Sequence, residues 1–251
     1  MTEPVLVLTD IHGCYYTMIR LLNRAPKGVR LVLNGDLVDR GPSSREVIEF
    51  AINNAIPTVM GNHEDLCLAF YKRAAHCISY YDRDVWLYNG GESTLGNWAT
   101  EGDIRGGRVP DEVLNWMEKL PAYLTPSDQL DSAGRKLLVS HTGYGLDADW
   151  GSSYGWFKAL WGRYKHGDGP FVAVEGDENK EGDDGFFRVF GHTYNREAEM
   201  TDRYCNIDTG AAYKKYNHLT GLIWPTKELL VQPYDERPVA PTFKLDNGVL
   251  V

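Results

Sequence analysis

Short apolar runs alternate with amphipathic stretches in the first part of the chain. Residues 4–8, 29–33 and 57–60 are short, mainly apolar runs, which predict buried strands. After each run, apolar residues recur at helical spacing, and Pro26 with Gly28 ends the first of these predicted helices. The order strand–loop–helix therefore occurs three times, which predicts a parallel sheet with right-handed crossovers.

Polar residues that can bind metals or transfer protons follow each of these predicted strands. The three segments are TDIHG (residues 9–13), LNGDLVDRG (33–41) and MGNHE (60–64). Asp10, Asp36 and Asn62 are spaced 26 residues apart, about the length of one strand–helix unit. Because parallel strands end at the same edge of a sheet, we expect these three side chains to converge.

The second half of the chain is also rich in predicted strands. They cover residues 136–140, 187–190, 204–208, 220–224 and 228–232. His141 and His192 lie at the ends of two of them. The second half is therefore expected to bring two imidazoles to the same site.

Three further segments have a different character. Residues 79–123 are rich in Trp and Gly, include a predicted helix at 110–120, and are interpreted as a helical subdomain over the site. Residues 165–185 form an acidic, Gly-rich segment, interpreted as a surface loop, and residues 234–251 form a Pro-containing tail. With 251 residues, 43% of them hydrophobic, we expect one domain over residues 1–251.

Charge and cysteine content exclude several classes of protein. The net charge of −9 argues against binding of nucleic acid or anionic membrane, both of which require a basic face. The N-terminal apolar run at 5–8 is too short for a signal peptide or a membrane span, so we expect a cytoplasmic protein. No long apolar heptad is present, which predicts a monomer or weak oligomer. The four cysteines, expected to be unpaired thiols, are Cys14, Cys67, Cys77 and Cys205.

Six side chains at predicted strand ends form a mixed nitrogen and oxygen set. They are Asp10, His12, Asp36, Asn62, His141 and His192. Such a set suits divalent manganese, iron or zinc, and it is too large for one tetrahedral ion. Two ions bridged by Asp36 are the simplest arrangement, and such pairs catalyse phosphoester hydrolysis. His76, His166 and His218 lack this setting and are interpreted as structural or surface residues.

The motifs together resemble the signature of the calcineurin-like metallophosphoesterases. The matching segments are TDIHG, GDLVDRG, GNHE, SHTG and FGHT, and the resemblance extends from residue 10 to about residue 210. Within this superfamily they are most similar to the phosphoprotein phosphatase group, in particular the bacterial and bacteriophage-type serine/threonine phosphatases. The fold implied is an α/β protein, a four-layer α/β/β/α sandwich with two mixed sheets and metal ligands on loops at strand ends.

The resemblance also implies a role for each matching residue. Asp10 and His12 would bind the first ion, Asp36 would bridge both ions, and Asn62, His141 and His192 would bind the second. His63 would act as general acid, held and kept charged by Asp39. Arg40 and Arg163 would bind phosphate oxygens, with Asn62 also contacting the substrate. The cofactor implied is a pair of divalent ions, manganese first, with iron or zinc as alternatives.

The sequence departs from the phosphatase pattern at two positions. Thr9 replaces a Gly, and Met60 stands where these phosphatases usually place an Arg near the substrate. An apolar residue there is also typical of symmetrical dinucleoside tetraphosphate hydrolases, which however usually carry Asp where this chain has Glu64 and Gln where it has His12. On balance, these positions favour the phosphatase group.

These observations leave a leading hypothesis and two alternatives. The leading one is a protein phosphatase that removes phosphate from Ser or Thr, or also from Tyr, by in-line attack of a metal-bridging hydroxide on a phosphoprotein or small phosphoester. The first alternative is a dinucleoside polyphosphate or nucleotide hydrolase, in which Trp86, Tyr88 or Trp98 could stack a base, although core packing is the simpler interpretation of these rings. The second is an inactive metal-binding regulatory protein.

Overall fold

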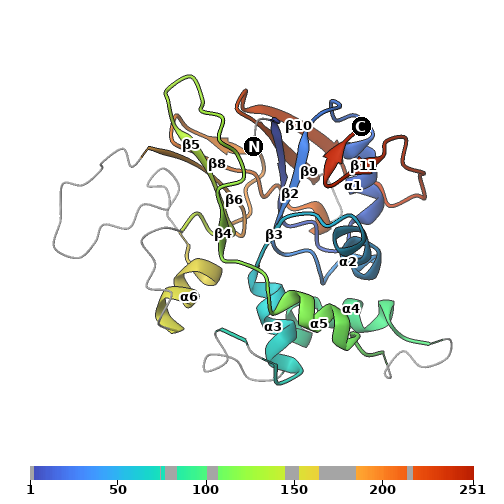
Figure 1. The fold of residues 1–251 in the computed structure, drawn as a ribbon. Helices are drawn as coiled ribbons and strands as arrows, with labels where there is room; N and C mark the ends of the chain where they lie inside the picture. Colours follow the sequence, from blue (N-terminus) through green and yellow to red (C-terminus); the bar gives the residue numbers. More distant parts are fainter. Residues whose placement is uncertain are drawn as a thin grey trace.

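Two β-sheets pack face to face in the computed structural model of the chain (Figure 1). The model describes residues 3–73, 75–76, 84–100, 107–144, 153–163, 185–213 and 217–251. The predicted acidic loop at 165–185 lies outside these residues except for Gly185, and so do Cys77, His166 and parts of the predicted helical subdomain.

The first sheet carries the strands predicted in the first third of the chain. Its order is β10-β9-β1-β2-β12-β11, and β3 also pairs with β2. The strands are β1 (Val5–Leu8), β2 (Arg30–Asn34), β3 (Thr58–Val59), β9 (His218–Trp224), β10 (Glu228–Pro233), β11 (Leu245–Asp246) and β12 (Val249–Leu250). β1, β2 and β3 are parallel, as predicted, and β9 lies antiparallel to β1.

The second sheet has the order β4-β5-β6-β8-β7. Its strands are β4 (Tyr123–Leu124), β5 (Lys136–Ser140), β6 (Phe186–Phe190), β7 (Glu199–Met200) and β8 (Tyr204–Asn206). β5, β6 and β8 are parallel, whereas the outer strands β4 and β7 pair antiparallel. The prediction of an α/β fold with two mixed sheets is therefore confirmed.

Helices flank the sheets and surround the ends of the strands. They are α1 (Tyr15–Leu22), α2 (Ser44–Asn53), α3 (Asn62–Phe70), the π-helical turn η2 (Leu87–Gly91), α4 (Glu92–Asn97), α5 (Asp111–Met117), α6 (Ser153–Trp161) and the 3₁₀ turn η3 (Ala211–Tyr213). In Figure 1, α1 and α2 lie beside the first sheet, and α3, α4 and α5 lie below the ends of its strands. No helix in the described ranges combines the length and apolarity needed to cross a lipid bilayer.

Alternating side chains of the first sheet fill two separate cores. Leu6 and Leu8 belong to the core that includes α1 and α2, while Val5 and Val7 pack between the two sheets. All four are fully buried. A strand buried on both faces requires apolar residues at every position, which explains the continuous apolar run in the sequence.

The segment interpreted as a tail has ordered structure. β11 and β12 form a hairpin, and Val249 of β12 pairs with Arg30 of β2. Asn247 and Gly248 join the two strands with φ of 47° and 78°, the backbone of a type I′ turn. The same segment places the Glu236 carboxylate at the start of α1, where it accepts the Thr17 N–H at 2.9 Å. This segment therefore belongs to the fold.

Candidate metal centre

The six predicted ligands are all buried and come from the same edge of both sheets. Asp10 follows β1, Asp36 follows β2, and Asn62 opens α3 directly after β3. His141 and His192 follow the parallel strands β5 and β6 of the facing sheet. The topology thus brings residues from positions 10 to 192 to one place.

The backbone at this edge adopts an unusual conformation. Asp10, His12, Asp36 and His192 have φ of 48°, 45°, 52° and 64°, in the left-handed region that residues other than glycine rarely adopt. Each such residue costs about 1–3 kcal/mol and persists only where the surroundings enforce it. The sharp turns keep the side chains at the strand ends pointing into one cluster.

Four side chains converge on one point between the sheets. Asn62 Oδ1 lies 2.9 Å from His141 Nε2 and 3.0 Å from His192 Nδ1, and Asp36 Oδ1 lies 3.4 Å from His141 Nε2. Asp36, His141 and His192 have ligand atoms close enough to hold one metal ion. His141 Nδ1 is 3.2 Å from the Asn34 carbonyl oxygen, so Nε2 is directed toward the cluster. These are the residues expected to bind the second ion.

A second group shares Asp36 but differs from the predicted first-ion set. His12 Nε2 lies 3.6 Å and His63 Nε2 lies 3.9 Å from Asp36 Oδ2, and these three residues form the other group with metal-ligand geometry. His12 Nδ1 is bound to the Val38 carbonyl oxygen at 2.8 Å. The first ion was expected to be held by Asp10 and His12 together with the shared Asp36. The observed group contains His63, the predicted general acid, in place of Asp10.

Asp10 lies between the two sheets, next to His192. Its carboxylate accepts the His192 N–H at 3.1 Å and lies 2.6 Å from the Thr9 hydroxyl. A Cβ on Gly191 would lie 1.9 Å from Asp10 Oδ2, so only glycine permits this approach. The threonine that departs from the family pattern thus helps to orient the carboxylate. Asp208, which the sequence analysis did not propose as a site residue, is buried nearby and raises the pKa of Asp10 by its charge.

The donor set fits divalent cations. Burial raises the pKa of Asp10 and Asp36 well above the ordinary value, with the neighbouring carboxylates Asp208 and Glu64 adding to the effect. Burial also lowers the pKa of His12 and His192, so their imidazoles are neutral, which is the form that binds metal. Among the described residues, His192 Nε2 is buried and has no hydrogen-bond partner. Clustered carboxylates and neutral imidazoles together are the environment that a cation stabilises.

His63 is held by a network that the sequence revealed only in part. Its Nδ1 lies 2.6 Å from Asp39 Oδ2, the contact that the resemblance implies. The indole N–H of Trp86 donates to Asp39 Oδ2 at 2.9 Å, and the Thr94 hydroxyl donates to Asp39 Oδ1 at 2.6 Å. Trp86 is buried, so it orients Asp39 and is not available to stack a base.

The charge state of this pair differs from the expected imidazolium. Burial lowers the pKa of His63, and the charge of Arg40 lowers it further. Burial raises the pKa of Asp39 to about 7, although the bonds from Thr94 and Trp86 oppose this rise. The Arg40 guanidinium is bonded to Nε2 of His12 at 2.5 Å and of His63 at 2.9 Å. In this arrangement both Nε2 atoms act as acceptors, as neutral imidazoles do.

Glu64 stabilises the loop that carries Asp36. Its carboxylate accepts the backbone N–H groups of Asp36 at 2.9 Å, Leu37 at 2.8 Å and Gly61 at 3.0 Å. Glu64 is fully buried, and these three donors satisfy a charge that burial would otherwise disfavour. The residue after His63 therefore has an internal structural role.

The remaining predicted residues differ in position. Arg163 lies just after α6 and is exposed. Burial lowers the pKa of His192 and raises the pKa of Asp208; the charge of Arg163 adds to the first effect and opposes the second, so Arg163 is in electrostatic range of the cluster. Met60 is fully buried in the core, and its N–H donates to the Pro121 carbonyl at 2.8 Å. Met60 is therefore part of the core. Trp98 packs against the same core.

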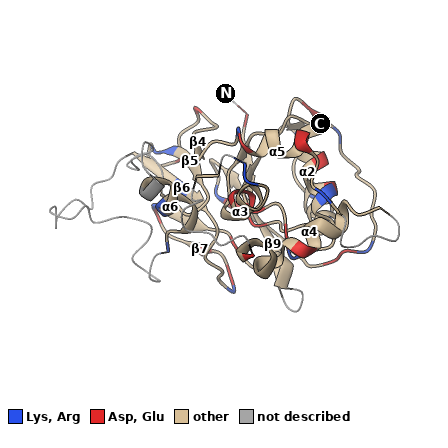
Figure 2. Cartoon of the chain, turned by 90° about the horizontal axis from the view of Figure 1, so that it is seen from below, with Lys and Arg blue, Asp and Glu red and all other residues tan. Residues whose placement is uncertain are grey.

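Residues expected to be structural are in ordinary settings. His76 stacks on Trp156 with ring centroids 3.4 Å apart, and His218 begins β9. Cys14, Cys67 and Cys205 are buried cysteines outside any described disulfide, as predicted. Within the described ranges, basic and acidic residues are interspersed along the chain (Figure 2).

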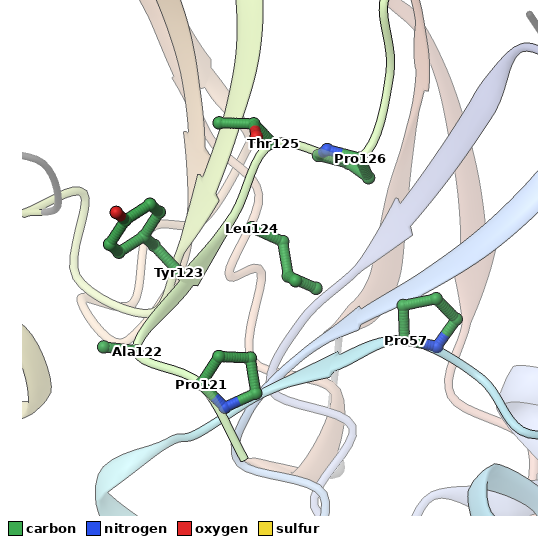
Figure 3. Close-up of a pocket in the computed structure, with 7 residues that line it drawn as sticks. All are labelled: Pro57, Pro121, Ala122, Tyr123, Leu124, Thr125 and Pro126. Atoms are coloured by element: carbon green, nitrogen blue, oxygen red, sulfur yellow. The ribbon is translucent and has the colours of Figure 1, made fainter. Parts of the chain in front are cut away.

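A shallow apolar hollow lies apart from the candidate metal centre. It has a volume of about 560 Å³ and lies between Pro57, which precedes β3, and the segment 121–126 around β4 (Figure 3). Its lining is Pro57, Pro121, Ala122, Tyr123, Leu124, Thr125 and Pro126. None of these residues is a predicted metal ligand, general acid or phosphate-binding group. The predicted site residues lie at the strand ends instead.

The fold and the buried cluster define a phosphoesterase. The chain belongs to the calcineurin-like phosphoesterase family, whose sequence model matches residues 3–198. It is therefore a hydrolase of a family that uses divalent metals, and the model has candidate ligand groups for them. The predicted resemblance is confirmed at this level.

Relatives and structures similar to this chain give a narrower comparison. A bis(5′-nucleosyl)-tetraphosphatase from Anoxybacillus flavithermus, described as asymmetrical, is 28% identical over 95% of this chain and 97% of its own. The enzyme of the same description from Bacillus velezensis is 30% identical over 96% of this chain and 97% of its own. A solved structure described as a candidate diadenosine tetraphosphatase has a TM-score of 0.56 and 19% identity, covering 93% of this chain and 94% of its own.

These relatives contradict the leading prediction of a protein phosphatase. Both bear the name of nucleoside tetraphosphatases and match this chain over nearly its full length. The prediction relied on Glu64 and His12, and it gave less weight to Met60, the position that resembled the tetraphosphate hydrolases.

Proposed function

We propose that the protein is a divalent-metal-dependent hydrolase that cleaves bis(5′-nucleosyl) tetraphosphates asymmetrically, into a nucleoside triphosphate and a nucleoside monophosphate. The observation that supports this substrate is the likeness to two asymmetrical bis(5′-nucleosyl)-tetraphosphatases over 95% and 96% of the chain. A match of this extent includes segments outside the metal-binding motifs, which are shared by enzymes of different specificity.

In this proposal the chain holds two manganese ions, with iron or zinc as alternatives. Asn62, His141 and His192, together with Asp36, would hold one ion, and Asp10 and His12, together with Asp36, would hold the other. When bound, such ions neutralise phosphate charge and lower the pKa of water so that it can attack phosphorus. The convergence of Asn62 Oδ1 with the two imidazole nitrogens at 2.9 and 3.0 Å supports the assignment of Asn62, His141 and His192 to one ion.

Two arginines are assigned to the phosphate chain. Arg40 reaches the imidazoles of His12 and His63 with both Nη atoms, so its guanidinium lies at the edge of the metal cluster. A guanidinium fork matches two oxygens of a phosphate. Arg163 is exposed after α6 and can add a second positive charge. A tetraphosphate carries several negative charges, and in a chain of net charge −9 such local cations are needed to attract it.

His63 is assigned to proton transfer, with Asp39 as its positioning residue. The Nδ1 contact to Asp39 at 2.6 Å fixes the ring and leaves Nε2 directed toward Arg40 and the cluster. To act as general acid, Nε2 would first take up a proton, and it would then donate that proton to the phosphate oxygen that departs. His63→Asn is expected to lower the rate at unchanged metal content, while His218→Asn, at the start of β9, serves as the matched control.

The products of diadenosine tetraphosphate test the proposal directly. Purified protein with added manganese is expected to release equal amounts of ATP and AMP, measured by ion-exchange chromatography, and to lose this activity in excess chelator. A phosphoserine or phosphotyrosine peptide at the same concentration is expected to be cleaved far more slowly. Release of ADP alone, or hydrolysis of the peptide in preference to the dinucleotide, would show that the proposal is wrong.

A further inference from the structure

Two exposed tyrosines lie beside the candidate metal centre without belonging to it. Tyr194 follows His192 by two residues, and Tyr213 ends η3. Their exposed fractions are 42% and 53%, and their rings meet edge to face with centroids 5.5 Å apart. Aromatic rings that pack on each other yet remain open to solvent provide a surface on which a flat ligand can stack.

Arg40 connects this pair of rings to the metal cluster. Its guanidinium carbon lies 5.5 Å from the centroid of the Tyr213 ring. The same guanidinium is bonded to Nε2 of His12 and His63. A phosphate held by Arg40 would therefore carry the next group of its molecule toward the exposed face of Tyr213.

The backbone holds both rings in place. Gly210 has φ of 73°, and a Cβ there would lie 2.6 Å from Tyr194 Cε2 and 2.8 Å from Tyr213 Cδ2. The Gly210 N–H donates to Asp208 Oδ1 at 3.0 Å, and the Tyr194 hydroxyl donates to Asn217 Oδ1 at 3.3 Å. The rings rest on a glycine backbone that is itself bonded to a buried carboxylate, so the surface is preformed.

We propose that Tyr194 and Tyr213 form the surface on which one nucleobase of a dinucleoside tetraphosphate stacks, with Arg40 holding the adjoining phosphates. This inference rests on the proposed function. Stacking uses the π face that every base presents, so the surface accepts different bases. It also requires no basic patch, which agrees with the acidic composition of the chain.

The position of the cut supports this assignment. In an asymmetrical cleavage the broken bond lies one phosphate from the nearer nucleoside, whereas in a symmetrical cleavage two phosphates intervene. The nearer base must therefore bind close to the metal centre. The Tyr213 ring meets this requirement because a single guanidinium touches both the ring and the imidazoles of the cluster.

Tyr88 provides a matched control. It is the most exposed of these tyrosines, at 89%, and lies in η2, whose Gly90 carbonyl accepts the Arg40 N–H at 3.3 Å. Tyr88 is thus near the same arginine through the backbone, and none of the described ring contacts includes it. Removal of its ring is not expected to affect base binding.

The test compares two substrates across four variants. KM and kcat are measured with manganese for diadenosine tetraphosphate and for p-nitrophenyl phosphate, which has no nucleobase, in Tyr213→Ala, Tyr194→Ala, Tyr213→Phe and Tyr88→Ala. Tyr213→Ala is expected to raise KM for the dinucleotide about tenfold, by the usual effect of removing a stacking ring. Tyr213→Phe keeps the ring and is expected to stay within about twofold of wild type, as is Tyr88→Ala. Activity on p-nitrophenyl phosphate is expected to be unchanged throughout.

Three results would overturn the inference. They are an unchanged dinucleotide KM in both alanine variants at the pair, an equal loss on both substrates, and a rise in KM for Tyr88→Ala alone. Failure of the proposed function would look different, because the wild-type protein would then cleave p-nitrophenyl phosphate but not the dinucleotide. That result would overturn both proposals.

Discussion

The two ends of the sandwich bury aspartates in opposite ways. At the end where β1 and β2 finish, Asp10 and Asp36 have left-handed backbone conformations and a raised pKa. At the other end, where β5 begins, Asp131 forms an ion pair with Lys227 at 2.6 Å. Burial raises the pKa of Asp131, but Lys227 and the N–H groups of Arg135 and Ala133 outweigh burial, and the net shift is downward.

This difference separates the structural role of a buried carboxylate from the functional one. Asp131 is balanced within the fold by Lys227, which also lies 3.9 Å from the Phe187 ring centroid between the sheets. The carboxylates at the other end face each other and neutral imidazoles, an arrangement that costs free energy in the protein alone. Such a cost is maintained where a cation or a substrate repays it.

The largest expected effect is the loss of activity when the aspartate at the centre of the metal cluster is neutralised. Asp36→Asn removes a charge from the centre of the metal cluster, and we expect kcat/KM for diadenosine tetraphosphate to fall about 1,000-fold or more, corresponding to the several kcal/mol that such metal sites contribute. Asparagine tolerates the left-handed φ of 52°, so the fold is retained. Kinetics with saturating manganese and metal analysis of the purified variant measure the effect.

Asp131→Asn is the matched control for this comparison. It neutralises a buried aspartate of the same protein, and we expect its activity to stay within about threefold of wild type in conditions where it is folded. Similar losses in the two variants would mean that both ends of the sandwich contribute to catalysis, and the distinction drawn here would be wrong.

Much of the framework could be read from local patterns. The apolar runs at 4–8 and 29–33 predicted β1 and β2 because strands buried on both faces need apolar residues throughout. The 26-residue spacing of Asp10, Asp36 and Asn62 predicted their convergence because each strand–helix unit returns the chain to the same edge. Both signals are local and periodic.

Contacts between distant segments had no such signal. Trp86 and Thr94 bind Asp39 across sequence separations of 47 and 55 residues, and neither lies in a motif. Asp208 lies within the range of the resemblance but had no assigned role, because only the fold brings it next to Asp10. The Asn247-Gly248 pair was a usable signal, since that dipeptide favours a type I′ hairpin turn, and it was missed.

The substrate was predicted wrongly for a related reason. The phosphatase hypothesis was favoured because Glu64 and His12 differ from the tetraphosphate hydrolase pattern, although Met60 fits that pattern. In the structure Met60 packs in the core and Glu64 binds backbone N–H groups. A residue next to a predicted metal ligand in the sequence can point away from the site. The motifs themselves are assigned to metal and phosphate binding, and a phosphate is common to all substrates of such enzymes, so the motifs do not identify the substrate.

A smaller effect is expected from the network behind His63. Thr94→Val keeps the shape of the side chain but removes the hydroxyl that donates to Asp39 Oδ1 at 2.6 Å and accepts the Asp39 N–H at 2.9 Å. We expect kcat to fall about 10- to 100-fold, the usual effect of losing a partner that orients a site residue. Steady-state kinetics on diadenosine tetraphosphate, with KM and metal content as separate readouts, provide the measurement.

Thr58→Val controls for loss of a buried hydroxyl outside the site. Thr58 lies in β3, and its hydroxyl donates to the Ile56 carbonyl at 2.9 Å. Its kcat is expected to remain near that of wild type. Equal decreases in the two variants would assign the effect on Thr94 to general loosening of the fold.

The smallest effect concerns the stability provided by the opposite end. The folded pKa of Asp131 is lowered, so its ionised form stabilises the fold above its unfolded pKa of about 3.9, and this contribution is lost as pH falls through the folded value. Asp131→Asn is expected to lower the free energy of unfolding by about 1–2 kcal/mol near neutral pH. This is less than for a fully enclosed ion pair, because Lys227 reaches solvent.

Urea denaturation of the variant and of wild type, in excess chelator and from neutral pH downward, provides the measurement. The difference in free energy of unfolding between the two proteins is expected to shrink below about pH 4. A difference that stayed constant with pH would mean that the substitution acts through packing and not through the charge of Asp131.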